Sequence, residues 1–121
     1  MSVDTALQTA LTPMGLPVAP NLYKGNATEY LVTNYSTIPE VYAERAPRAA
    51  RYLTQIHYYL PHRKNPNLTI RQISRALWST GFTWPGVTNA SDSEGQHYVL
   101  ECEWVDGGGY YAPQPEEAQN E

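Results

Sequence analysis

Apolar and polar side chains alternate over residues 51–60, in the middle of the chain. One side of an extended backbone there carries Tyr52, Ile56, Tyr58 and Leu60, and the other carries Arg51, Gln55, His57 and Tyr59, with Leu53 as the apolar exception. A period of two residues is typical of a strand with one buried face and one solvated face. We therefore predict a strand over residues 51–60 at the centre of the fold.

A second alternation covers residues 97–105. It places Tyr98, Leu100, Cys102 and Trp104 on one face and His97, Val99, Glu101 and Glu103 on the other. Because the two patterns match, we expect the two strands to be antiparallel neighbours. Cys102 is the single cysteine and lies on the apolar face, which predicts a small buried side chain rather than a disulfide or a nucleophile.

Between these strands the period changes to that of a helix, over residues 68–80. Ile70, Ile73 and Leu77 form one apolar stripe, which we expect to pack on the apolar face of the two strands. That face is the one carrying Tyr52, Ile56, Leu100 and Trp104. Asn67 or Thr69 is the expected cap at the start of the helix, and Gly81 with Phe82 is expected to end it.

A shorter helix is predicted at the N-terminus, where apolar residues recur at helical spacing. These residues are Val3, Ala6, Leu7, Ala10 and Leu11. Ser2 is the expected N-cap, and Pro13 and Gly15 end the helix. A helix of this length is marginal alone, so its stripe must dock on the sheet.

The remaining segments are richer in proline, glycine and polar residues. Prolines demote residues 16–25 to an edge or entry segment. A strand is predicted over residues 29–36, and residues 44–50 are expected to be a loop or a bulge. A short strand over residues 82–84 would be followed by a long flexible connection over residues 87–96.

Together these elements predict an α+β (mixed α/β) fold in one small domain over residues 1–106. The domain would hold a mainly antiparallel sheet of four to five strands packed against two helices, with a flexible hairpin loop. Residues 107–121 are polar and acidic, which predicts a flexible, disordered tail.

The aromatic composition is skewed, with ten tyrosines and one phenylalanine. A tyrosine can be half buried and half solvated, so it suits a surface that another molecule covers. The strand predicted over 29–36 has no cleanly apolar face, as expected for a strand that is covered on both sides or for one at a subunit contact. We therefore take Tyr30, Tyr35 and Tyr42 as candidate contact residues.

Charge is separated along the chain, although the net charge is only −4. Residues 1–44 carry −3, residues 45–75 carry +7 without an acidic residue, and residues 76–121 carry −8 without a basic residue. Neighbouring strands can neutralise each other within one subunit, or unlike faces can meet in a head-to-tail assembly. The candidate interface residues of the second interpretation are Arg48, Arg51, Arg71 and Arg75 on one side and Glu94, Glu101 and Glu103 on the other.

No pattern in the sequence indicates a catalytic, metal or cofactor site. His57 and His97 can lie close on paired strands, but they are not spaced as part of a known metal motif. We expect both histidines to face solvent beside Glu101 or Glu103. Those two glutamates would pair across strands with Arg51 or His57. We therefore predict that the protein is not an enzyme and needs no cofactor.

Neither a secretion signal nor a membrane-spanning run is visible, which predicts a cytoplasm-like compartment and no membrane. The basic stretch 45–75 could contact nucleic acid, but the acidic balance of the whole chain argues against strong non-specific binding.

Several stretches follow one another in a recognisable order after the N-terminal helix. They are YLVTNY at 30–35, IPEVYAE at 38–44, the aromatic strand 51–60, a helix ending in Gly81-Phe82, and QHYVLE at 96–101. In this order, over about residues 3–105, the chain resembles the tail-completion proteins of long-tailed bacteriophages. These proteins are also called tail terminators or tail-to-head joining proteins.

The resemblance implies a hexameric ring that caps the tail tube, stops its polymerisation and joins the tail to the head connector. Its partners would be further copies of the chain, the tail tube protein and a head-completion or connector protein, with DNA passing through the ring without specific binding. The location would be the head–tail junction of the virion, and the host cytoplasm during assembly.

Two other classes of protein fit the same composition. One is a small-molecule-binding protein or enzyme with a pocket between helix and sheet, lined by Tyr52, Tyr58 and Trp104. The other is a general protein-interaction adaptor. A monomer or dimer would favour either of these, and a six-fold ring would favour tail completion.

Overall fold

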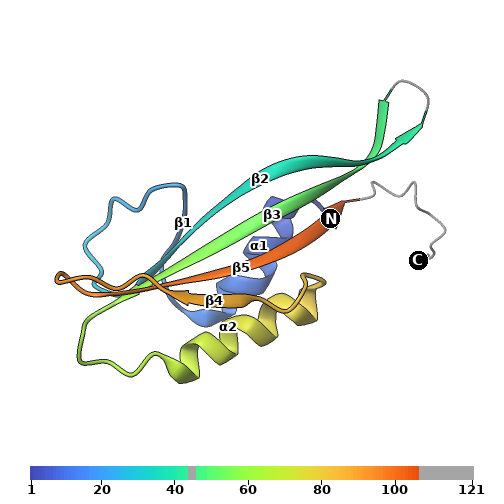
Figure 1. Ribbon diagram of the computed structural model, residues 1–121. Coiled ribbons are helices and arrows are strands. Elements are labelled where there is room, and N and C mark those ends of the chain that lie inside the picture. The colour runs from blue at the N-terminus through green and yellow to red at the C-terminus, as the bar shows by residue number, and fades with distance from the viewer. Residues whose placement is uncertain (44–45, 107–121) are drawn as a thin grey trace.

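The computed structural model describes the backbone of residues 1–43 and 46–106, and the side chains of residues 1–37 and 51–105. The elements follow one another as α1 (Val3–Leu11), the short 3-10 helix η1 (Thr12–Met14), β1 (Val18–Pro20), β2 (Tyr30–Ala43), β3 (Ala46–Leu60), α2 (Asn67–Thr80), β4 (Gly86–Asn89) and β5 (Gln96–Asp106). The predicted α+β fold of one small domain, with its two helices, is confirmed (Figure 1). The predicted tail, residues 107–121, lies outside the described residues.

The sheet has five strands in the order β1-β2-β3-β5-β4. All neighbours are antiparallel except β1 and β2, which are parallel. The two alternating strands are neighbours as predicted, with Tyr52 opposite Trp104 and Ile56 opposite Leu100. The segment interrupted by prolines contributes only the three-residue edge strand β1.

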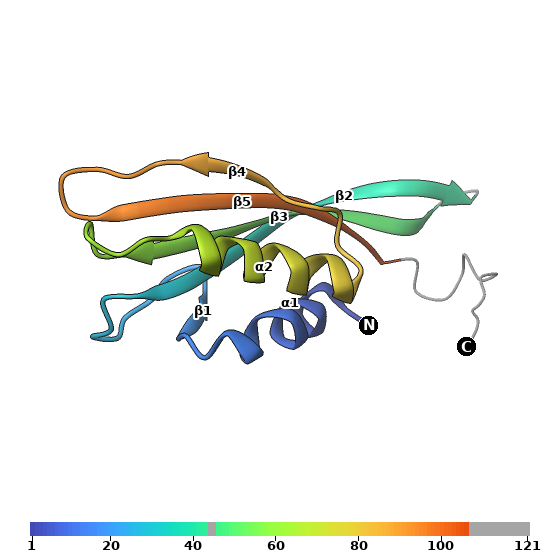
Figure 2. The ribbon, with the colours of Figure 1, turned by 90° about the horizontal axis from the view of Figure 1, so that it is seen from below.

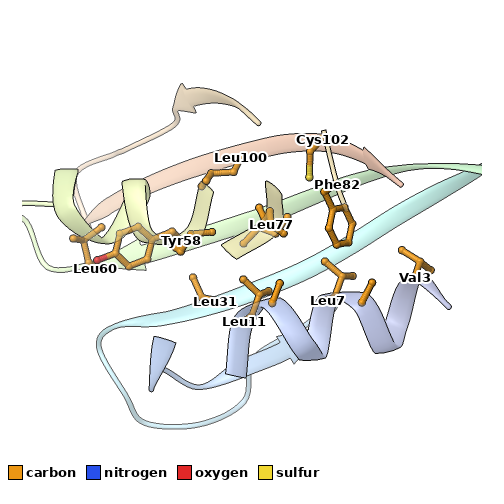
Figure 3. Packing of buried hydrophobic residues seen from close by; sticks show 14 residues of the cluster. Val3, Leu7, Leu11, Leu31, Tyr58, Leu60, Leu77, Phe82, Leu100 and Cys102 are labelled. Atoms are coloured by element: carbon orange, nitrogen blue, oxygen red, sulfur yellow. The ribbon is translucent and has the colours of Figure 1, made fainter. Parts of the chain in front are cut away.

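Both helices lie on the same face of the sheet, which leaves the other face open (Figure 2). The core between the layers combines apolar side chains of α1 and α2 with those of β2, β3 and β5. Figure 3 shows Leu7 and Leu11 of α1 pointing toward the strands. Ile56 and Leu100 are fully buried there, which confirms the predicted apolar face. Neither helix of the described chain is long and apolar enough to span a membrane.

Cys102 is buried in this core, as its place in the alternation predicted. Burial raises the pKa of its thiol to about 11, and the thiol therefore stays protonated at neutral pH. The Thr54 hydroxyl lies beside it and is within hydrogen-bond distance of both the Cys102 carbonyl oxygen, at 2.8 Å, and the sulfur, at 3.1 Å. This environment is that of a packing residue rather than a nucleophile.

The start of α1 follows the sequence pattern, and the start of α2 does not. The Ser2 hydroxyl accepts a hydrogen bond from the Thr5 amide at 3.2 Å, which confirms the predicted cap. In α2 the capping position is Pro66, which makes no side-chain capping bond, so the prediction of Asn67 or Thr69 was wrong. The Asn65 side chain instead accepts from the Asn67 amide at 2.9 Å, which satisfies that donor from one residue further upstream.

The end of α2 is as predicted. Gly81 adopts φ of 124°, and the Phe82 amide donates back to the Leu77 carbonyl at 3.0 Å. Phe82 is then turned under the helix, where it is 1% exposed and packs against Trp104. A side chain at position 81 would meet the Trp104 ring at 2.9 Å, so both backbone and space require glycine there.

The prediction of a loop or bulge over residues 44–50 was wrong for the larger part of that segment, because β3 already begins at Ala46. β2 and β3 pair along a hairpin that extends well past the helices in Figure 1. The irregularity lies instead on β2, in register shifts between Pro39, Val41 and Tyr42. A bulge accommodates a proline, which cannot donate to the ladder, and the strand continues beyond it.

The strand predicted over residues 82–84 was also wrong, since β4 begins at Gly86. Residues 87–89, predicted as part of a flexible connection, pair with β5. The turn that follows is closed by a bridge between Asp92 and Gly95 and by the Asp92 carboxylate, which accepts from the Glu94 amide at 2.9 Å. Mobility of this turn in the free protein stays a prediction.

Leu100→Ala should lower the free energy of unfolding by about 2–5 kcal/mol, because it leaves a cavity where β5 meets the core. Val105→Ala on the same strand is the matched control. Val105 is 46% exposed, so its truncation should cost within about 0.5 kcal/mol. Urea unfolding of both variants measures the difference. Equal losses would mean that the core face has been assigned wrongly.

Gly81→Ala should cost about 1–3 kcal/mol, because alanine is strained at this φ and its methyl group meets the Trp104 ring. Gly86→Ala is the control, since a Cβ there meets nothing within 4 Å. Thermal unfolding should rank the Gly81 variant well below both the parent and the control. A Gly81 variant as stable as the control would contradict the proposed packing of the helix end.

Candidate subunit and partner interface

A column of stacked rings crosses the open face of the sheet. Tyr23 stacks on Tyr30 at 4.2 Å between ring centroids, Tyr30 on Tyr59 at 4.9 Å, and Tyr59 on His97 at 4.2 Å. His57 continues the column, 5.0 Å from His97. The five rings come from three strands and the loop before β2.

Strand register produces this column. Tyr30 is paired with Tyr59 across β2 and β3, and Tyr59 with His97 across β3 and β5, so three rings stand side by side on one face. Tyr23 is held at the end of the column because its hydroxyl accepts from the Ala27 amide at 3.0 Å. Sequence reasoning placed Tyr59 and His97 on the solvated face, but missed the stacking because the register between strands was not known.

The two histidines contact each other, with His57 Nδ1 at 2.8 Å from His97 Nε2. On its other side, His57 Nε2 lies 3.1 Å from the Asn34 amide nitrogen and 3.2 Å from the Gln55 amide oxygen. The two rings are half-buried rather than solvent-facing, so the predicted exposure was wrong, whereas the predicted glutamate neighbour is correct for His57, which interacts electrostatically with Glu101. The physical reason is that the stacked rings cover them.

Burial lowers the pKa of both histidines. Glu101 opposes the shift at His57, whereas at His97 the neighbouring His57 adds to it and Asp92 opposes it. Two imidazoles that share a hydrogen bond need one ring nitrogen to accept, which a doubly protonated pair cannot supply. The contact therefore needs at least one neutral ring, and the lowered pKa values favour the neutral form of both. Within the described residues, no group of three or more His, Cys, Asp or Glu side chains could hold a metal ion.

Some of the predicted interface charges pair within the chain. Arg51 lies 3.6 Å from Glu103, as the cross-strand prediction expected, and Gln55 donates to Glu101 at 2.8 Å. The intramolecular interpretation of the charge blocks is therefore correct for Arg51 and Glu103. Both side chains remain more than a third exposed, so the pair adds little to stability.

Sequence reasoning missed Glu29, a residue just before β2 whose carboxylate contacts two side chains from later parts of the chain. It accepts hydrogen bonds from the Tyr58 hydroxyl and from the Lys64 ammonium group. Burial alone would raise the pKa of Glu29, but the bonds from Lys64 and Tyr58 outweigh it and lower the pKa. On the Tyr58 side, burial and the bond to Glu29 raise the pKa to about 12. No sequence pattern indicates this contact, because Glu29, Tyr58 and Lys64 come from three separate parts of the chain.

A second uncovered surface is the outer side of α2. Arg71 and Arg75 are exposed there, as predicted, and neither forms an ion pair within the described part of the chain. Leu68 is 64% and Trp78 60% exposed, one at each end of the same helical stripe. Trp78 also meets the exposed Trp84 edge to face, with 6.4 Å between ring centroids. Two exposed tryptophans in contact form an apolar patch, and such patches on a protein surface often mark a site where another molecule binds.

The other predicted contact residues have mixed positions. Tyr30 belongs to the ring column, and Glu94 lies in the turn before β5. Tyr35 lies on the helix side of the sheet, where its hydroxyl donates to the Asp4 carboxylate of α1. The side chains of Arg48 and Tyr42 lie outside the described residues.

The pocket that the small-molecule alternative would need between helix and sheet is filled by the side chains named as its lining. Tyr58 is fully buried, and Trp104 packs against Phe82 with 4.9 Å between ring centroids. Tyr52 meets Tyr35 edge to face at 5.4 Å. Two recesses lie away from these residues. One of about 590 Å³ lies beside α1 and the β1 edge of the sheet, with Leu7, Val18 and Thr33 among its lining residues. Another of about 400 Å³ lies at one end of the sheet, and Tyr30, Tyr59, His97, Asp92 and Glu94 are among its lining residues.

Comparisons with known proteins find a similar fold and indicate no function. No protein-family model matches the chain, and no curated protein matches it. One solved structure, whose title states no function, is 14% identical to the chain with a TM-score of 0.50. The match covers 88% of this chain and 95% of that chain. The likeness extends over nearly the whole of both domains, and it is one of fold alone.

The free energy of unfolding should fall as the pH is lowered from 7.5 to 5. The folded pKa values of His57 and His97 lie below the unfolded value of about 6.5, so the unfolded chain binds protons first and is favoured below that pH. Glu29 acts in a separate window, because its contribution is lost only below its ordinary value of 4.5. Urea unfolding at several pH values measures the slope.

His57→Gln should flatten this dependence, since it removes one titrating ring and lessens the repulsion on the other. Val99→Ala is the control, because Val99 lies opposite His57 on β5 and its truncation leaves both rings in place. An unchanged slope in the His57 variant would contradict the assignment of the pH dependence to the histidine pair.

Proposed function

We propose that the protein is a virion structural protein of a long-tailed bacteriophage, a tail-completion protein. In this function it caps the tail tube as a ring, stops tail polymerisation and joins the tail to the head connector. The observation that carries the proposal is that one small domain leaves two unlike surfaces uncovered on opposite layers. These are the open sheet face with its ring column and the outer side of α2.

A closed ring needs a heterologous interface, in which one patch of each subunit meets a different patch of the next. Two unlike surfaces on one domain meet this requirement, whereas a two-fold dimer needs only one self-complementary patch. Aromatic and arginine side chains, which are abundant on the two surfaces here, are the residue types that contribute most to protein interfaces. The order of sequence stretches that resembles the tail terminators supports the same function.

The β2–β3 hairpin supplies a third contact element. It projects past the helices, with backbone pairing that continues to Ala43 and Ala46 (Figure 1). A projecting arm can reach a neighbouring subunit or the end of a tube without disturbing the core of its own domain. In the proposed function the arm would bind a neighbouring subunit or the tail tube protein, and the ring as a whole would bind the head connector.

The purified protein should form rings of six subunits, or should form them when tail tubes are present. Native mass spectrometry would give a species of six times the 13.6 kDa chain, and negative-stain electron microscopy would show a six-fold ring. Added to polymerising tail tubes, the protein should stop growth at the end that it covers. A chain that stays monomeric or dimeric and leaves tube growth unchanged would contradict the proposal.

Salt should affect the rate of ring formation more than the stability of a formed ring. Exposed charges steer association and are screened when ionic strength rises from about 0.05 M to about 0.5 M, whereas buried aromatic contacts are not. Light scattering after dilution measures the two rates separately. A ring that dissociates as strongly as its formation slows would mean that charge pairs, and not apolar contacts, hold it together.

A further inference from the structure

The outer side of α2 presents one stripe of exposed apolar and basic side chains. They recur every three or four residues along the helix, as Leu68, Arg71, Arg75 and Trp78. Trp84 is 53% exposed and meets Trp78 at one end of the stripe, so two indole rings lie there together. Within the residues that the structure describes, neither arginine forms an ion pair. A partner that is both aromatic and acidic would match the two parts of this stripe.

The segment that follows β5 has this composition. Residues 107–121 contain three acidic residues and no basic residue. A tyrosine pair, Tyr110 and Tyr111, comes first, and a glutamate pair, Glu116 and Glu117, follows it. Tyrosine rings pack well against indole rings, and carboxylates accept the N–H groups of guanidinium groups. The two pairs therefore match the tryptophans and the arginines of the stripe.

The end of β5 brings this segment to the same end of α2. The Thr83 amide donates to the Glu103 carbonyl at 3.1 Å, and Trp104 packs against Phe82, directly after the helix. β4 pairs with β5 only as far as Glu101. Figure 2 shows β5 ending beside the last turn of α2. The chain therefore leaves the sheet near the tryptophan end of the stripe.

The connection is long enough to return to the tryptophans. Asp106 lies three residues past Glu103, about 10 Å along the strand. The four residues 107–110 can reach back by about 13 Å. The first three of them are glycines, whose backbone reverses direction without a steric penalty. Tyr110 can therefore reach the level of Thr83 and the neighbouring Trp84.

The spacing of the two pairs also fits the helix. From Tyr111 to Glu116 the sequence contains two prolines, which favour an extended backbone that would span about 15 Å. Along α2, Arg75 lies about 4 Å and Arg71 about 10 Å from Trp78. The segment therefore covers the distance from the tryptophans to both arginines with some length to spare.

We propose that residues 110–117 bind the outer side of α2 in the same molecule, with the tyrosine pair on the two tryptophans and the glutamate pair at the two arginines. A short connection within one chain keeps the two surfaces at a millimolar effective concentration, so contacts that are individually weak are sufficient. The contact covers a surface that the proposed ring also uses. The segment and a neighbouring subunit would then compete for α2, and only this consequence rests on the proposed function.

Three double variants of the full chain test the contact. They are Tyr110→Ser with Tyr111→Ser, Glu116→Lys with Glu117→Lys, and Arg71→Glu with Arg75→Glu. Each should raise the quenching of tryptophan fluorescence by acrylamide roughly 1.5-fold or more, since two of the three tryptophans lose their cover. Combining the two charge reversals should restore the quenching of the parent, because the opposite charges face each other again.

Two further variants are matched controls. Gln119→Ser with Asn120→Ser changes the segment beyond the proposed contact, and Arg63→Glu reverses an exposed arginine outside α2. Both should be quenched like the parent, and far-ultraviolet circular dichroism checks that every variant is folded. A parent quenched as strongly as the tyrosine variant would overturn the contact, and so would combined reversals that restore nothing. Shielding that increases with protein concentration would assign the segment to a second copy and overturn the contact within one chain.

The outcomes for the contact and for the ring are distinguishable. If the two compete, the tyrosine variant should form rings faster than the parent, because its α2 is uncovered. Shielded tryptophans in a parent that forms no ring support the contact and overturn only the ring. Rings formed by a parent without such shielding overturn the contact and leave the ring.

Discussion

The pairing of β3 with β5 is the constraint on which the rest of the structure depends. Eleven residue pairs join the two strands, and the side chains of successive pairs point alternately to the helix side and to the open side. Leu100 and Ile56 go into the core because their neighbours in both strands point away from it. Since both helices cover the same face, the alternation that builds the core also determines which side chains remain for other molecules. The same strand register therefore determines both the core residues and the residues of the candidate interface.

The parts of the fold that depend on local pattern could be predicted from the sequence. The two alternating strands, the two helices and the helix end at Gly81-Phe82 follow from periodicity and from single-residue preferences. The boundaries near Ala46 and Gly86 could not be predicted, because proline and glycine there indicated a break while a bulge or a partner strand kept the chain extended. The side chain that accepts from the first turn of α2 is that of Asn65, and not of Asn67 or Thr69, because the capping position is Pro66, which has no side-chain acceptor.

The candidate interface was less predictable, because it depends on which residues meet across strands. Arg51 and Arg71 have the same charge and both come from the basic stretch, but only Arg51 lies beside a strand that carries an acidic partner, Glu103, diagonally across from it. The histidine contact and the ring column likewise require the β3–β5 register, which no local pattern encodes. Charge blocks along a sequence therefore indicate that pairing occurs, and the fold decides which charges pair within the subunit and which remain exposed.

The short edge strands have a consequence for how such a protein can associate. β1 has three residues and β4 has four, so each offers few backbone groups to a strand of another molecule. Further along β2 the ladder is irregular at Pro39 and Val41, which also disfavours an added strand. Extension of the sheet from β1 or β4, the first step toward fibrous aggregates, is therefore poorly supported. β1 covers β2 only over Leu31–Thr33, so the outer side of β2 beyond Thr33 is the longer edge, and the irregularity at Pro39 and Val41 is what limits an added strand there.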